Sequence, residues 1–224
     1  MDAPLGMGGL LTALLLTSWV PRVGEVTELR PDTADGRLAD SRAIVSGPDD
    51  RLWMAAPAGI GDHLGRISVT GEYTDIAIDP PAAMALALDD ESVWLALWGG
   101  SAAAIGRVAV DEFSYNRTEL AGGTVLSDLV FGPDGWLWFA EFEPGSIRRL
   151  DPVTSHLDDV LVTGDLGRPL ALMPNPAGPG VWVAIESNLI VLVLEDGTIA
   201  KQIPLTFQAV DGVAVDGSVC SRLR

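Results

Sequence analysis

Residues 131–141 read FGPDGWLWFAE and combine a turn signal with a strand signal. The turn is Gly-Pro-Asp-Gly at residues 132–135, where proline presets one backbone angle and aspartate and glycine tolerate the angles that follow. An apolar run centred on Trp138 comes next and has the composition of a buried β-strand. The stretch therefore predicts a hairpin turn that leads directly into a strand.

The same combination recurs along the chain at a nearly constant period. Trp53, Trp94, Trp138 and Trp182 lie 41, 44 and 44 residues apart, each among apolar neighbours. Turn residues precede the other three tryptophans as well, at 47–50 (GPDD), 89–91 (DDE) and 178–180 (GPG). A fixed period of this size indicates a repeat architecture, and bulky rings at that period predict packing between the repeats.

Each repeat contains enough alternating segments for four short strands. Its last segment alternates in polarity, as in residues 73–78 (YTDIAI) and 200–205 (AKQIPL). Four antiparallel strands in one repeat make one propeller blade, and no stretch has a sustained helical period. We therefore predict an all-β fold, a β-propeller with blades at about 42–84, 85–127, 128–170 and 171–211.

The two ends of the chain match parts of one further blade. Residues 212–224 resemble the two innermost strands of a blade, and residues 24–29 (GEVTEL) resemble the outermost strand at 71–76 (GEYTDI). We predict that 212–224 and about 10–35 form a fifth blade, so that residues 1–224 make one closed domain. The alternative is a partial version of a larger propeller.

The charge of the chain restricts its partners. The 224 residues carry 31 Asp plus Glu against 14 Lys plus Arg, a formal net charge of -17. Such a chain repels phosphate backbones and anionic lipid head groups, so we expect no nucleic acid and no membrane as partner. Cys220 is the single cysteine, which excludes an internal disulfide and agrees with a cytoplasmic location. We expect a monomer that binds a small molecule or a peptide.

The repeat also resembles a known family. The pattern G-P-D-G-x-L-W-F-x-E, followed by I-G-R-[IV] and a Gly turn with T-E or T-D, is similar to the streptogramin B lyase (virginiamycin B lyase) propellers over about residues 41–205. The resemblance implies a seven-bladed, magnesium-dependent enzyme that opens a cyclic depsipeptide by elimination, with a histidine and acidic residues on one face.

This chain departs from that pattern in length and in histidine content. It is shorter by about two blades and has two histidines. The family places histidine near the start of innermost strands, where this chain has Arg42, Ala83, Ser127 and Leu170. No catalytic histidine of the family is therefore carried over to a position of this sequence.

Propeller geometry groups the remaining polar residues by face. Innermost strands begin, and second strands end, on one face, which we expect to hold His63, Asp128, Glu141 and Glu186. His156 falls on the opposite face, so the two histidines are not expected to act together. We predict that Glu141, Glu186 and Asp128 bind magnesium or calcium, which prefer oxygen ligands. His63 and Glu141 are the predicted catalytic residues, with His63 as the base.

Two further groups of side chains have predicted roles. Trp98 lies off the tryptophan period and is predicted to bind ligand, together with Arg42 and Arg168. Arg66, Arg107 and Arg149 recur with the repeat and are predicted to donate hydrogen bonds between blades.

Two functions follow from these patterns and remain open at this point. One is a divalent-cation-dependent lyase that opens a cyclic peptide or ester. The other is a non-catalytic propeller that binds a ligand or a protein, which the missing histidines and the reduced length favour. A lactonase-type hydrolase is disfavoured, because the expected mouth has few asparagines to hold a central metal.

Overall fold

The computed structural model confirms the all-β prediction. It describes residues 43–47, 49–55, 63–78, 82–99, 102–206, 211–215 and 218–222. These residues form four antiparallel sheets of four strands each, followed by a two-stranded sheet. Each four-stranded sheet is built from consecutive strands in chain order, as in a propeller blade. Residues 1–42, which include most of the predicted fifth blade, lie outside the described residues.

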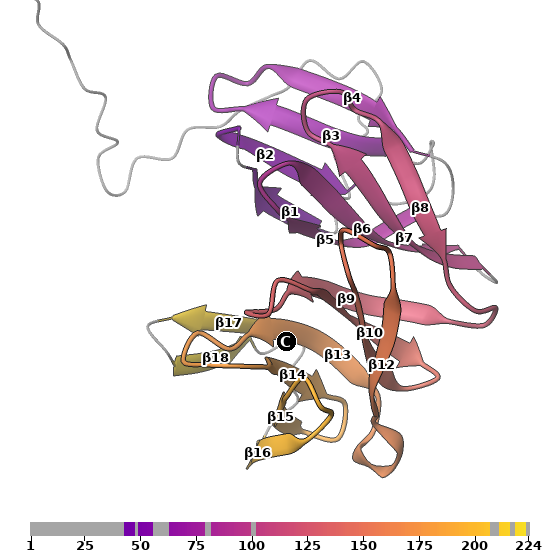
Figure 1. Ribbon diagram of the computed structural model, residues 1–224. Helices are drawn as coiled ribbons and strands as arrows, with labels where there is room; N and C mark the ends of the chain where they lie inside the picture. Colours follow the sequence, from indigo (N-terminus) through magenta and orange to yellow (C-terminus); the bar gives the residue numbers. More distant parts are fainter. Residues whose placement is uncertain are drawn as a thin grey trace, which may run out of the picture.

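The first two blades contain strands β1 to β8. Their bounds are β1 (Ala43–Ser46), β2 (Arg51–Ala55), β3 (His63–Ser68), β4 (Tyr73–Ala77), β5 (Ala82–Leu88), β6 (Ser92–Gly99), β7 (Ala102–Ala109) and β8 (Tyr115–Glu119). Figure 1 shows them as two successive sheets.

The later blades follow the same order. Their strands are β9 (Val125–Phe131), β10 (Leu137–Glu143), β11 (Ser146–Leu150), β12 (Leu157–Val162), β13 (Pro169–Pro174), β14 (Val181–Ile185), β15 (Leu189–Val193), β16 (Ile199–Pro204), β17 (Asp211–Val215) and β18 (Ser218–Arg222). A short 3-10 turn, η1 (Gly164–Leu166), precedes β13. The described residues include no helix of the length and apolarity that a membrane crossing needs.

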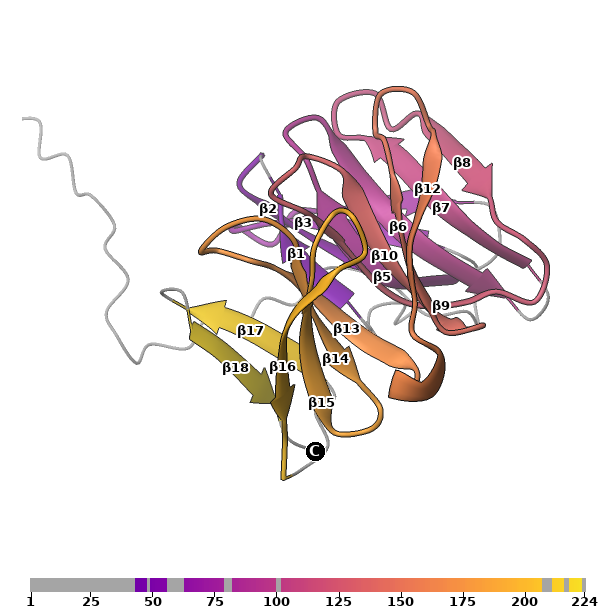
Figure 2. The same ribbon diagram turned by 60° about the horizontal axis from the view of Figure 1, so that its bottom comes forward.

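The innermost strands of successive sheets lie against one another. β1 contacts β5, β5 contacts β9, β9 contacts β13, and β13 contacts β17. In the view of Figure 2 the sheet β17–β18 lies beside β13 and β14. The sheet β17–β18 agrees with the predicted two inner strands at 212–224, while closure of a five-blade ring stays a prediction.

Three of the four periodic tryptophans fill the spaces between blades, as predicted, whereas Trp182 packs in a cluster of its own blade. Trp53 is fully buried in a cluster shared by blades 1 and 2, and Trp94 lies in the cluster between blades 2 and 3. Trp138 is fully buried between blades 3 and 4. Each of these three rings therefore removes its apolar surface from water against the next blade, which is the main stabilising term of the stack.

The aspartate of each turn fixes the tryptophan of its own blade. In blades 1 to 3 the indole N–H donates to this carboxylate. The nitrogen–oxygen distances are 3.2 Å for Trp53–Asp49, 2.8 Å for Trp94–Asp89 and 3.0 Å for Trp138–Asp134. A buried indole N–H without a partner would cost its full desolvation energy, so the turn residue and the core residue depend on each other.

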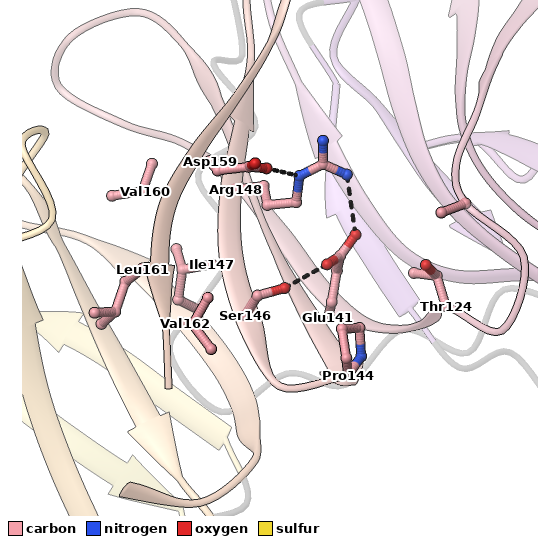
Figure 3. Close-up of a pocket in the computed structure, with 11 residues that line it drawn as sticks. Thr124, Glu141, Pro144, Ser146, Ile147, Arg148, Asp159, Val160, Leu161 and Val162 are labelled. Atoms are coloured by element: carbon pink, nitrogen blue, oxygen red, sulfur yellow. Dashed lines mark hydrogen bonds and ion pairs between the residues drawn. The ribbon is translucent and has the colours of Figure 1, made fainter. Parts of the chain in front are cut away.

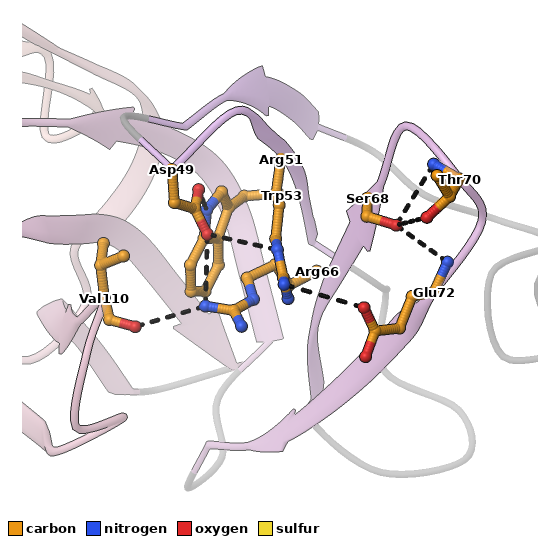
Figure 4. Close-up of polar contacts among 8 residues, drawn as sticks. All are labelled: Asp49, Arg51, Trp53, Arg66, Ser68, Thr70, Glu72 and Val110. Carbon is orange, nitrogen blue, oxygen red and sulfur yellow. Dashed lines mark hydrogen bonds and ion pairs between the residues drawn. The ribbon is translucent and has the colours of Figure 1, made fainter.

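The recurring arginines connect blades in two of three cases. Arg66 Nη1 lies 3.2 Å from Asp49 Oδ2 and donates to the carbonyl of Val110 in the next blade at 3.4 Å (Figure 4). Arg107 Nη1 donates to the carbonyl of Pro152, one blade further along the chain, at 3.4 Å. The predicted inter-blade role is thus confirmed for Arg66 and Arg107.

Arg149 has its ion-pair partners within its own blade. Its guanidinium pairs with Asp134 at 3.1 Å and with Asp158 at 2.8 Å, and it stacks over the ring of Trp136. The three arginines therefore share a position in the repeat but not the same bonding pattern.

Candidate functional site

Glu141, a predicted catalytic residue, lines a pocket. Near the end of β10 it is 3% exposed, although it carries a carboxylate. The Ser146 hydroxyl donates to its Oε2, and Arg148 Nη1 lies 3.3 Å from its Oε1 (Figure 3). Arg148 Nε in turn donates to Asp159 Oδ1 at 2.6 Å. A buried charge of this kind is tolerated because it is paired and hydrogen-bonded.

The strand register explains how these four side chains meet. Glu141 pairs with Ser146 across the β10–β11 hairpin, and Arg148 pairs with Phe139 one step along the same face. Asp159 lies opposite Arg148 on β12. Because alternate residues of a strand share a face, Glu141 points to the same side as Phe139, which packs against blade 2.

The same positions in the neighbouring blades are apolar. The pair Glu141–Ser146 corresponds to Leu97–Ala104 in blade 2 and to Ile185–Leu189 in blade 4. At the positions of Glu141 and Ser146, blade 3 thus carries polar side chains where blades 2 and 4 carry apolar ones. Such a network stabilises less than an apolar pair of similar size, so a role other than stability is expected for it.

A pocket of about 490 Å³ opens beside this network. Polar groups occupy one side of it, and Val162 of β12 supplies apolar surface together with Ala121 and Pro144 of the neighbouring loops. Its lining residues are Ala121, Thr124, Glu141, Pro144, Ser146, Ile147, Arg148, Asp159, Val160, Leu161 and Val162. We call it the blade 3 pocket. Pockets of 300–1,000 Å³ with apolar walls and a few converging polar groups are typical of small-ligand sites.

A second pocket of about 460 Å³ shares three lining residues with the first, Ala121, Thr124 and Pro144. Arg168, a predicted ligand-binding residue, lines it and pairs with Glu143 at 3.1 Å. Arg168 therefore lies next to the blade 3 pocket, on the same end of the blades.

His63 lies in a different blade from Glu141. It is the first residue of β3 in blade 1, and its Nδ1 lies 3.1 Å from Asp75 Oδ1. His156, whose ring packs edge-on against Trp136, belongs to blade 3. Among the interactions of the described residues, none joins either histidine to Glu141.

The carboxylates predicted to bind metal have separate surroundings. Asp128 accepts hydrogen bonds from the backbone N–H groups of Leu129 and of Leu172 in the next blade, each at 2.8 Å. Glu186 is exposed. In the described part of the chain no group of three or more His, Cys, Asp or Glu side chains is placed to hold a metal ion. Binding of magnesium or calcium by Glu141, Glu186 and Asp128 stays a prediction.

The other two predicted ligand residues are not among those that line the two pockets described above. Trp98, at the end of β6, packs against the core cluster between blades 2 and 3. Arg42 lies outside the described residues.

Sequence reasoning did not identify Ser146, Arg148 and Asp159. Their signal was a break in the repeat, because Arg148 stands where the preceding repeats have Gly65 and Gly106. A Cβ at Gly106 would lie 2.9 Å from Leu97, which shows how tightly an ordinary blade packs there. A large charged side chain at the equivalent position of blade 3 therefore marks a different environment.

Comparison with solved structures identifies the fold. Virginiamycin B lyase from Staphylococcus aureus superposes with a TM-score of 0.74 at 19% identity over 88% of this chain and 67% of the lyase chain. A catalytically inactive variant of the same lyase with quinupristin gives 0.68 at 20% identity over 81% of this chain and 62% of the lyase. Hydrazine synthase from Kuenenia stuttgartiensis gives 0.67 at 11% identity over 80% of this chain and 70% of that chain.

These likenesses show a propeller fold of the virginiamycin B lyase type, as the sequence resemblance indicated. This chain spans about two thirds of the length of the lyase chains. No family model matches the sequence, and no curated protein matches it significantly. At 20% identity or less the fold is shared, and the activity is a separate question.

Proposed function

We propose that this chain is a ligand-binding propeller module and that the blade 3 pocket is its binding site. The observation that carries the proposal is the network of Glu141, Ser146 and Arg148 at positions where blades 2 and 4 are apolar. Burying this network is expected to stabilise the blade less than an apolar pair of similar size would. Its side chains line a pocket of about 490 Å³, where they are available to a ligand.

The apolar rim of the pocket provides a direct test. Val162 lines the pocket and is 76% exposed, so a tryptophan there would block the entrance without disturbing the core. Val153 is 88% exposed in the loop at the other end of β12, and Val153→Trp serves as the matched control.

Binding is measured by amide chemical-shift changes in ¹H–¹⁵N spectra. The probes share a phenylbutyl body and differ in the head group, which is an ammonium, a hydroxyl or a carboxylate. We expect at least one probe to shift the amides around Ser146 in the wild type and in Val153→Trp, but not in Val162→Trp. Shifts that persist in Val162→Trp, or no shift with any probe, would refute the proposed site.

A second candidate is a divalent-cation-dependent lyase acting on a cyclic peptide or ester. The fold likeness to virginiamycin B lyase favours it. On this hypothesis His63→Ala and Glu141→Gln each abolish turnover while the protein stays folded. The assay follows loss of quinupristin with magnesium present, and undiminished turnover in both variants would exclude these residues.

Metal dependence separates the two candidates. A cation that binds only the native state raises the midpoint of thermal unfolding by mass action. The lyase hypothesis predicts such a rise with magnesium or calcium, together with metal in the purified protein. A protein that binds a phenylbutyl probe, shows no metal effect and leaves quinupristin intact is the binding module.

A further inference from the structure

We infer that the blade 3 pocket takes a cationic ligand, an ammonium or guanidinium group on an apolar body, such as a basic side chain of a peptide. The inference rests on the proposed binding function and names its ligand class. It follows from the charges in the pocket, from the hydrogen-bonding groups left open there, and from the apolar wall beside them.

The pocket contains more negative than positive charge. Arg148 is its single cationic lining residue, and it is shared between two carboxylates, Glu141 at 3.3 Å and Asp159 at 2.6 Å. Counting formal charges, the three groups sum to one negative charge. The chain as a whole carries -17, so its long-range field also attracts a cation.

The open hydrogen-bonding positions favour a donor. Thr124 lines the pocket and is 4% exposed, and within the described residues no partner bonds its hydroxyl. Asp159 uses one oxygen for Arg148, and its side chain is 83% exposed at the pocket rim. An ammonium or guanidinium group supplies several N–H donors, and either oxygen could accept from it.

An anion would meet an unfavourable arrangement in the same place. Arg148 uses Nε and one N–H of Nη1 for its two carboxylates, so an anion could reach only the remaining N–H groups of Nη1 and Nη2. It would then lie next to Glu141 and Asp159, and repulsion from two carboxylates opposes attraction to one guanidinium. The pocket therefore discriminates by charge.

The apolar wall indicates what the cationic group is attached to. Val162 lies opposite Ser146 on β12, and Ala121 and Pro144 from the neighbouring loops also line the pocket. Val162 is 76% exposed, which leaves apolar surface at the rim. A ligand that buries an aliphatic or aromatic body against this wall removes that surface from water.

The phenylbutyl probes test the inference, because they share one body and differ in the charge of the head group. We expect 4-phenylbutylammonium to bind at least about tenfold more tightly than 5-phenylpentanoate, and 4-phenylbutanol to lie between them. Asp159→Asn should weaken the ammonium probe by about two- to fivefold, which is the range for an exposed charge pair. Asp165→Asn, which removes the same charge from an exposed residue outside the pocket, should leave its affinity unchanged.

Three results would overturn the inference, and one of them also removes the proposed function. Equal or tighter binding of the pentanoate or the alcohol in the pocket leaves a binding module that does not select cations. An equal loss in Asp159→Asn and Asp165→Asn would mean that net charge, not the pocket, attracts the probe. No binding of any probe at the pocket would refute both proposals.

Discussion

Replacing Asp134 should lower the free energy of unfolding more than replacing most other turn residues, because its carboxylate is hydrogen-bonded to the buried Trp138 indole. Its side chain is 9% exposed, and it accepts from the Trp138 indole at 3.0 Å and pairs with Arg149 at 3.1 Å. Asp158 pairs with the same arginine at 2.8 Å but is 40% exposed. The two aspartates therefore form a matched pair that differs in burial and in the indole contact.

The expected magnitudes follow from what each substitution leaves behind. Asp134→Ala strands the N–H of the fully buried Trp138, at about 1–3 kcal/mol, and removes one partner of a largely buried guanidinium. Arg149 keeps Asp158, so the total loss of unfolding free energy should be about 2–4 kcal/mol. Asp134→Asn keeps an acceptor for the indole and should cost about 1–2 kcal/mol. Asp158→Asn should cost about 0.2–1 kcal/mol, as for exposed pairs.

Urea unfolding followed by tryptophan fluorescence and by far-ultraviolet circular dichroism gives these free energies, provided that the two transitions coincide. Trp138→Phe combined with Asp134→Ala completes a double-mutant cycle. Its coupling energy should be about 1 kcal/mol if the indole contact contributes as argued. An Asp134→Ala loss no greater than that of Asp158→Asn would refute the reasoning, as would a coupling energy near zero.

Three further perturbations test how the blades are held. A Cβ on Gly132 would lie 2.4 Å from the indole nitrogen of its blade, so Gly132→Ala should cost about 1–3 kcal/mol in chemical unfolding, whereas Gly122→Ala, with nothing within 4 Å, should cost almost nothing. Asp128→Ala removes the acceptor of the Leu172 N–H, and hydrogen exchange of that amide should accelerate at least about tenfold. Deletion of residues 212–224 should lower the thermal midpoint and cooperativity if the termini close the ring, and unchanged unfolding would contradict closure.

The blades were predictable because two local signals agree in every repeat. The turn residues predict where the chain reverses. The period of Trp53, Trp94 and Trp138 predicts which side chain packs between blades. The hydrogen bond from each indole to its turn was not predicted. Its sequence signal is the spacing of four or five residues between aspartate and tryptophan, as in Asp49 and Trp53.

The candidate site was predictable only in part, because position along a strand does not determine the direction of a side chain. Glu141, Glu186 and Asp128 were grouped on one face because innermost strands begin there, as for Asp128, and second strands end there, as for Glu141 and Glu186. Glu141 is two residues beyond Phe139 and shares its face, so it points between blades 2 and 3. Asp128 bonds to the backbone of the next blade instead. Strand alternation, applied to β10, would have separated the two.

The partners of Glu141 depend on register, which the sequence specifies weakly for a polar pair. Ser146 and Arg148 lie on the next strand, and a shift of one residue would turn both to the opposite face. The register of an apolar pair such as Leu97 and Ala104 can be inferred from the sequence, because both residues must be buried. The register of a charged pair can be inferred only from the residues around it. Alignment of the repeats gives that register.

Comparison between repeats thus indicates function more directly than the motif that defines them. The first three repeats share a turn aspartate bonded to a buried tryptophan. Glu141 and Arg148 break the apolar pattern together, and removing Arg148 would leave Glu141 charged in a buried position. A paired departure of this kind has no use in stacking blades, so its place next to a pocket is the strongest reason to look for a ligand there.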